Sequence, residues 1–170
     1  MSLRIPYYRQ QAPYTCGPAV LRMALSAMGK RRSEAYLARL AETTAREGTS
    51  NFGLLRCLRK LNIEYMTWYR GSYRDIQLNV KNGIVIIDWM PQLIFPEHPE
   101  FRPSREFNPD EDAHYALIVS AGEKFVTLQD PALGRRLRVS RASFLKAWRD
   151  PLSTSNHWML VVLHHEEHLE

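Results

Sequence analysis

The pattern of apolar and polar residues changes along the chain from helical spacing to strand-like runs. Between residues 16 and 27, apolar residues recur at the spacing of one helical face. Pro18 fits the first turn of this helix, where its missing N–H costs nothing, and Gly29 fits its C-terminal cap. The apolar stripe is wide enough to predict a central helix, and it comprises Ala19, Val20, Leu21, Met23, Ala24, Leu25 and Ala27.

Two further helices are expected in the N-terminal part of the chain. Ser33 is a good N-cap for a helix that runs to about Glu42. Ser50 or Asn51 caps a third helix that ends near Leu61. One face of the third helix is apolar and consists of Leu54, Cys57, Leu58 and Leu61.

Strand patterns dominate the second part of the chain. A weak helix is expected from Tyr73 to Val80, and a short helix from Ser140 or Ser143 through Trp148. Because helices come first and strands follow, the predicted class is α+β with an antiparallel sheet, in a single domain that spans residues 1–170. Short apolar runs predict strands at 63–69, 84–87, 113–120, 124–129, 135–139 and 158–163.

Residues 89–109 show neither the helical spacing nor the strand-like runs of apolar residues. Five prolines fall within these 21 residues, so no regular element is expected there. A loop of this length inside a compact domain is usually functional. We expect it to form a lid or a groove wall, with an irregular surface excursion as the alternative. Its large aromatic residues are Trp89, Phe95, Phe101 and Phe107.

Composition excludes several classes of function. The chain has 170 residues, of which 45% are hydrophobic and 24% charged, as in an ordinary globular domain. No apolar run is long enough to span a membrane, and no signal-peptide pattern precedes the first helix, so a cytoplasmic protein is expected. The net charge is +5, but the basic residues are scattered without interleaved aromatic residues, which argues against nucleic-acid binding.

The C-terminal residues 164–170 invite a metal-site hypothesis. His164 and His168 have the i,i+4 spacing of helical metal ligands. They follow a predicted strand and end the chain, so we interpret this stretch as a solvated, disordered tail. The sequence predicts neither a metal nor a cofactor.

The two cysteines have different surroundings. They could in principle form a disulfide, but a chain of this size needs none. Cys57 lies on an apolar helical face and is interpreted as a buried core residue. Cys16 stands at the predicted start of the first helix, where the positive end of the helix dipole stabilises a thiolate. Gly17 beside it leaves space for a substrate backbone.

A base and an orienting carboxylate follow from the predicted hairpin. His114 opens a strong strand directly after the long loop. If residues 121–123 form a three-residue turn, Ser120 pairs with Lys124, and His114 lies directly opposite Asp130. A carboxylate at that distance can orient an imidazole and fix its tautomer. Asp112 is the alternative carboxylate.

Acyl transfer also needs donors for the developing oxyanion. The backbone N–H of Cys16 is one donor. A side-chain amide from the preceding loop is a natural second donor, and either Gln10 or Gln11 can supply it.

The spacing of these residues resembles the motif of a known family. The motif is a glutamine six residues before Cys-Gly-Pro-Ala at a helix start, then a strand that begins with histidine, then Asp-Pro sixteen residues later. It is similar to papain-like cysteine peptidases and, more narrowly, to bacteriocin-processing (double-glycine-leader) peptidases and their free-standing bacterial relatives. The resemblance implies Cys16 as nucleophile, His114 as base, Asp130 as orienting residue and Gln10, not Gln11, as oxyanion residue.

The expected function is therefore a thiol peptidase that acts on a peptide or protein substrate. Substrate contacts are assigned to Gly17, Trp89 and Ala113. Two alternatives stay open at this point. One is an acyltransferase, transpeptidase or amidase that forms the same acyl-enzyme, and the other is a non-catalytic peptide-binding module.

Overall fold

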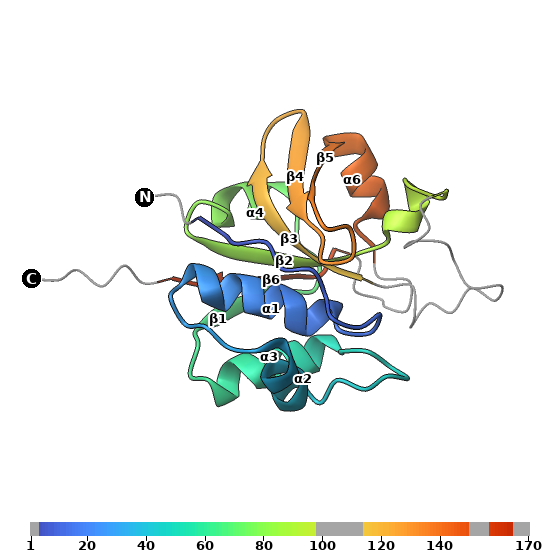
Figure 1. Cartoon of the computed structure of the whole chain (residues 1–170). Coiled ribbons are helices and arrows are strands. Elements are labelled where there is room, and N and C mark those ends of the chain that lie inside the picture. The colour runs from blue at the N-terminus through green and yellow to red at the C-terminus, as the bar shows by residue number, and fades with distance from the viewer. Residues whose placement is uncertain (1–3, 98–113, 150–156, 165–170) are drawn as a thin grey trace, which may run out of the picture.

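The fold comes from a computed structural model, in which residues 4–97, 114–149 and 157–164 are described. One antiparallel sheet lies between two helical layers (Figure 1). The lower layer in this view holds α1 (Cys16–Ala27), α2 (Glu34–Ala41) and α3 (Asn51–Lys60). The other face of the sheet is covered by α4 (Tyr73–Asn79) and α6 (Arg141–Ala147).

The strand order in the sheet brings three strand ends to one edge. The order is β1-β6-β2-β3-β4-β5, and every neighbouring pair is antiparallel. Consequently the end of β2, the start of β3 and the end of β4 meet at the same edge. The strands are β1 (Tyr65–Trp68), β2 (Gly83–Trp89), β3 (His114–Ala121), β4 (Phe125–Gln129), β5 (Arg136–Ser140) and β6 (Met159–Leu163).

The central strand β2 separates two hydrophobic cores. Its side chains alternate between the faces of the sheet, as expected for a strand. Ile84 and Ile86 pack with the helices α1, α2 and α3. Val85, Ile87 and Trp89 pack with α4 and α6 in the second core. All five side chains are buried, so this strand is held from both sides.

The expected helix caps explain where the second and third helices begin. The Ser33 hydroxyl accepts a hydrogen bond from the N–H of Tyr36 at 3.2 Å. The Ser50 hydroxyl accepts one from the N–H of Gly53 at 3.0 Å. Both side chains satisfy backbone donors that the first helical turn leaves unpaired. The start of α1 has no side-chain cap of this kind.

The prediction of a loop that starts at residue 89 was wrong for its first residues. Trp89 is the last residue of β2 and pairs with His114 on β3. A short 3-10 helix, η1 (Pro91–Leu93), follows, and its first residue is a proline, which suits that position. Phe95 then packs against the second core. Residues 98–109, which include the rest of the expected lid, lie outside the described residues, as does the tail from residue 165.

Within the described part of the chain, none of the helices combines the length and apolar character that a membrane crossing requires. The cytoplasmic location stays a prediction.

Close packing of α2 against α3 depends on Gly53. A Cβ at this position would lie 2.5 Å from the backbone oxygen of Ala41, which is closer than real contacts allow. We expect Gly53→Ala to lower the free energy of unfolding by about 1–3 kcal/mol, as overpacking does. Urea denaturation measures the loss.

Gly122→Ala is the control for this substitution. A Cβ there would meet the Phe125 oxygen at 3.5 Å, an ordinary contact. Its expected cost is below about 0.5 kcal/mol. Equal losses in the two variants would contradict the packing argument.

Candidate active site

Cys16 is the first residue of α1, and the helix start around it is open. The preceding Thr15 turns its hydroxyl back to Ala12, with which it exchanges hydrogen bonds of 2.9 and 3.0 Å. It therefore does not cap α1. Because Pro18 has no N–H, the backbone donors at this helix end belong to Cys16 and Gly17. Such donors and the helix dipole favour negative charge.

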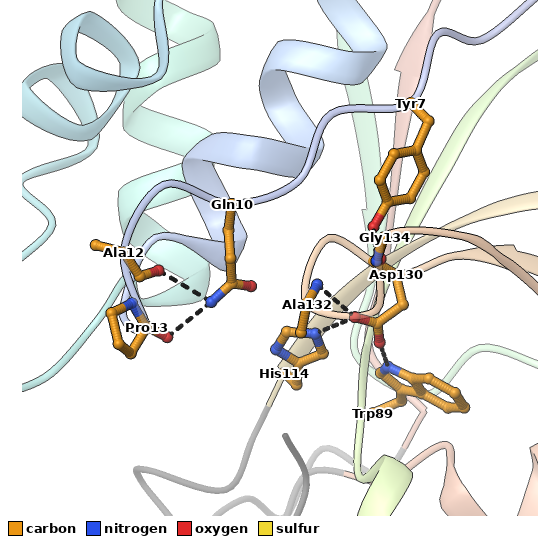
Figure 2. Close-up of polar contacts among 9 residues, drawn as sticks. All are labelled: Tyr7, Gln10, Ala12, Pro13, Trp89, His114, Asp130, Ala132 and Gly134. Carbon is orange, nitrogen blue, oxygen red and sulfur yellow. Dashed lines mark hydrogen bonds and ion pairs between the residues drawn. The ribbon is translucent and has the colours of Figure 1, made fainter. Parts of the chain in front are cut away.

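His114 and Asp130 form a close, buried pair. His114 Nε2 lies 2.6 Å from Asp130 Oδ1. The Asp130 side chain has no exposed surface, and that of His114 is 13% exposed. Figure 2 shows the two side chains facing each other at the edge of the sheet where β3 begins. With Nε2 on the carboxylate, the other ring nitrogen, Nδ1, lies on the side of the ring away from Asp130.

The surroundings of His114 favour its charged form. Burial alone would lower the pKa of this histidine. The charge of Asp130 opposes burial, as do the charge of Cys16 and hydrogen bonds to both side chains, and the net result raises the pKa well above 6.5. Both Asp130 and Cys16 thus lie close enough to His114 to act on its charge. This arrangement favours the imidazolium form of His114 beside the Asp130 carboxylate.

The backbone of the Asp130 loop is tied to the N-terminal segment. The Tyr7 hydroxyl donates to the backbone oxygen of Asp130 and accepts from the N–H of Gly134 at 2.6 Å. Burial raises the pKa of Tyr7, so its hydroxyl stays protonated and can donate. The N–H of Gln10 donates to the oxygen of Pro131 at 2.9 Å. The segment that leads to Cys16 and the loop that carries Asp130 are therefore held together.

Gln10 lies in the loop before Cys16 and uses its amide internally. Its Nε2 donates to the backbone oxygens of Ala12 at 2.9 Å and Pro13 at 3.0 Å (Figure 2). Both amide hydrogens are occupied in this conformation. The carbonyl oxygen Oε1 is buried and has no hydrogen-bond partner. The amide must therefore turn before Nε2 can reach an oxyanion.

Gln11, the other glutamine considered for the oxyanion, is held by its backbone. Its N–H donates to Glu34 Oε1 at 2.8 Å. Glu34 is buried at the start of α2, so this bond anchors the loop to the second helix.

The predicted strand register of the hairpin was wrong, although the pair it led to does form. The turn spans Gly122–Phe125, and a β-bulge lies between Ile118 and Ser120. Leu117 pairs with Gln129, and the same register places Ala116, not His114, opposite Asp130. His114 and Asp130 are therefore diagonal neighbours, and their long side chains close the distance. The error arises from the turn, which has four residues instead of the expected three and begins one residue later, and the bulge on β3 offsets the resulting shift by only one residue.

The expected substrate contacts have different surroundings. A Cβ on Gly17 would lie 2.8 Å from the Cβ of Thr49, so this glycine is needed for packing against the segment before α3. Trp89 is fully buried, and its indole N–H donates to Asp130 Oδ2 at 3.2 Å. Ala113 and Asp112 lie outside the described residues.

Sequence reasoning missed Tyr7 as a residue of this site. It lies in an extended segment far from Asp130 in sequence, and no local pattern distinguishes it from Tyr8 beside it. Only the three-dimensional path of the N-terminal segment reveals its contact with the Asp130 loop.

Cys57 has the environment of a core residue. It is fully buried on α3, and burial raises its pKa to about 11. It is a free thiol, as is Cys16. Across the described ranges, no three histidine, cysteine or acidic residues gather closely enough to hold a metal ion. His168 lies outside these ranges.

A hollow of about 1240 Å³ lies at the opposite end of β3 from His114. It is lined by the loop after α4 and by the turn between β3 and β4. Neither Cys16 nor Asp130 contributes to it. The concentration of charge and reactive groups, rather than hollow volume, identifies the candidate site.

Comparison with known proteins agrees with the geometry. A sequence profile described as "Peptidase_C39 like family" matches residues 2–155. An uncharacterized protein of Methanothermobacter marburgensis is 30% identical over 138 residues, which cover 81% of this chain and 79% of that protein. A second uncharacterized protein, from Methanothermobacter thermautotrophicus, is 32% identical over 135 residues, or 79% and 77% of the two chains.

Solved structures show the same fold at lower identity. The peptidase domain of Streptococcus ComA, a bifunctional ABC transporter of a quorum-sensing pathway, matches with a TM-score of 0.70 at 18% identity over 95% of this chain and 100% of that domain. A double glycine motif protease from an AMS/PCAT transporter, solved with its leader peptide, matches with a TM-score of 0.68 at 18% identity over 96% and 94%. The fold is thus that of the papain-like C39 peptidase domains, and the chain belongs to the Peptidase_C39 like family.

Proposed function

We propose that this protein is a cysteine peptidase that cleaves a peptide bond of a peptide or protein substrate through Cys16, His114 and Asp130. The observation that carries the proposal is the buried His114–Asp130 pair at 2.6 Å, with the pKa of His114 raised by both Asp130 and Cys16. Membership of a C39-like peptidase family supports the same reaction class.

In the acylation step, the Cys16 thiolate attacks the carbonyl carbon of the scissile bond. A C–S bond forms and the carbonyl electrons move to oxygen, where backbone N–H groups at the start of α1 lie. When the tetrahedral intermediate collapses, the C–N bond breaks. His114 gives its Nδ1 proton to the leaving amine and becomes neutral.

In the deacylation step, neutral His114 takes a proton from a water molecule that attacks the thioester. The C–S bond breaks, the acid product leaves, and the thiolate–imidazolium pair is restored. Asp130 keeps the imidazole oriented throughout and stabilises its charge. Gln10 serves as the second oxyanion donor after its amide turns away from the oxygens of Ala12 and Pro13.

The substrate is a peptide segment that passes the start of α1. The solved double glycine motif protease binds a leader peptide, and a peptide chain is the corresponding ligand proposed here. Gly17 and Ala113 remain candidate contacts for its backbone. Trp89 is assigned a different role, because its side chain is buried against Asp130.

The thiolate–imidazolium pair predicts a characteristic reactivity of Cys16. Iodoacetamide should alkylate Cys16 well below about pH 7, because the thiolate persists beside a charged imidazole. Cys57 is the internal control and should stay unreactive at that pH, since its pKa is about 11. Mass spectrometry of the alkylated peptides against pH measures both rates. A Cys16 that reacts like an ordinary thiol, with a pKa near about 8.5, would contradict the proposal.

Removal of the Asp130 charge should change the pH profile in a defined direction. Asp130 raises the pKa of His114, so Asp130→Asn should lower that pKa and move the alkaline limb of kcat/KM to lower pH. We expect the maximal rate to fall by roughly 100-fold. The readout is cleavage of a proteome-derived peptide library, with Cys16→Ala as the inactive reference.

Asp75→Asn is the matched control for the Asp130 substitution. Asp75 caps the exposed start of α4 through Ser72 and has no contact with the candidate site. Its variant should keep the wild-type pH profile. An Asp130→Asn enzyme with an unshifted alkaline limb would overturn the assigned role.

Transfer of the acyl group to an added amine, without hydrolysis, would instead indicate an acyltransferase.

The two glutamines before Cys16 provide a matched pair for the oxyanion assignment. Gln10→Ala should lower kcat by roughly 100-fold or more, because one oxyanion donor is lost. Gln11→Ala should change kcat little, because Gln11 is anchored through its backbone N–H. The alkylation of Cys16 at low pH should survive in both variants. Equal kcat losses for the two substitutions would refute the choice of Gln10.

A further inference from the structure

The Asp130 carboxylate is buried deeply and needs several donors. Its side chain has no exposed surface. Oδ1 lies 2.6 Å from His114 Nε2 and accepts from the N–H of Ala132 at 2.9 Å. Oδ2 accepts from the indole N–H of Trp89 at 3.2 Å. A buried carboxylate is tolerated only when its oxygens are paired in this way.

Trp89 holds both partners of the pair from one position. Its backbone lies at the end of β2, in register with His114 on β3. Its side chain reaches Asp130, which lies just beyond β4 (Figure 2). The next residue, Met90, donates its N–H to the oxygen of Ala147 at 2.8 Å, so the end of β2 is also fixed to α6.

The indole is rigidly held. It has no exposed surface and packs in the core between the sheet and α4 and α6. A side chain with two torsion angles in such a core has one available orientation. The direction of its N–H is therefore fixed before substrate binds.

We propose that Trp89 is a positioning residue of the peptidase, whose indole N–H fixes the Asp130 carboxylate so that Oδ1 faces His114. Trp89 touches the reacting groups only through Asp130. This role rests on the proposed function for its catalytic meaning, and it replaces the substrate contact expected from the sequence. Without the indole N–H, the carboxylate can rotate about its last torsion and its charge is less well stabilised.

Trp89→Phe tests the proposal, with Trp148→Phe as the matched control. Trp148 is also fully buried in the second core, and its indole N–H donates to the oxygen of Trp158 at 2.9 Å. Both substitutions remove one buried indole donor, and urea denaturation shows what each costs the fold. Only Trp89→Phe removes a donor from Asp130.

The expected result separates positioning from stability and from substrate contact. Misplacement of a catalytic group by about 1 Å can cost about 100-fold in rate, so kcat should fall by roughly 10- to 100-fold in Trp89→Phe with KM changed less than about twofold. Its alkaline limb should move to lower pH, because the charge beside His114 is held less firmly. The alkylation of Cys16 should begin at higher pH, because a weaker imidazolium stabilises the thiolate less. Trp148→Phe should leave both profiles unchanged.

Two outcomes would overturn the proposal. One is an equal pH profile in the two variants, which would reduce Trp89 to a packing residue. The other is a rise in KM with kcat unchanged, which would indicate that Trp89 contacts the substrate. A wild-type Cys16 without reactivity at low pH would defeat the proposed function instead, and it is recognised before any variant is made.

If Trp89→Phe does not fold, a measurement on the wild-type protein still tests the proposal. In ¹⁵N-labelled enzyme, the indole N–H resonance of Trp89 should shift as His114 titrates, because both groups share the Asp130 carboxylate. The indole resonance of Trp148 should not follow that titration. A Trp89 resonance as flat as that of Trp148 would refute the coupling.

Discussion

The hydrogen-bonded ion pair between His114 and Asp130 is the interaction on which the site depends. A carboxylate with no exposed surface is costly unless it is paired and its remaining oxygens are bonded. Here the pairing supplies charge for the imidazole, and the raised pKa of His114 follows. The start of α1 then presents Cys16 to a base that already carries a proton. In the proposed reaction, this proton is then already in place for the leaving amine.

The pair is supported by elements that are distant in sequence. Tyr7 in the N-terminal segment binds the Asp130 backbone, and Trp89 at the end of β2 binds its carboxylate. The antiparallel order of the sheet makes this convergence possible, because three strand ends meet at one edge. The loop before Cys16 joins the same network through the bond from Gln10 to Pro131. A change in any of these supports is expected to alter the contact between Asp130 and His114.

Most helices and strands could be predicted from the sequence, because they depend on local signals. The apolar stripe of the first helix, the serine caps and the short apolar strands each arise from neighbouring residues. The contact of His114 with Asp130 was also expected, but through a register that the turn at Gly122–Phe125 changes. The long-range contacts of Tyr7 and Trp89 were not predictable, since nothing near them in sequence marks a partner more than forty residues away. The conformation of the Gln10 amide likewise depends on how its loop folds back.

An NMR titration of the His114 ring in the substrate-free protein tests the proposed ion pair most directly. We expect the imidazole to stay protonated well above pH 6.5, because the charges of Asp130 and Cys16 outweigh burial. We also expect the pKa of His114 to fall when Cys16 is replaced by alanine, since one of the two charges is lost. A His114 that loses its proton at or below pH 6.5, and does so regardless of Cys16, would contradict the thiolate–imidazolium pair.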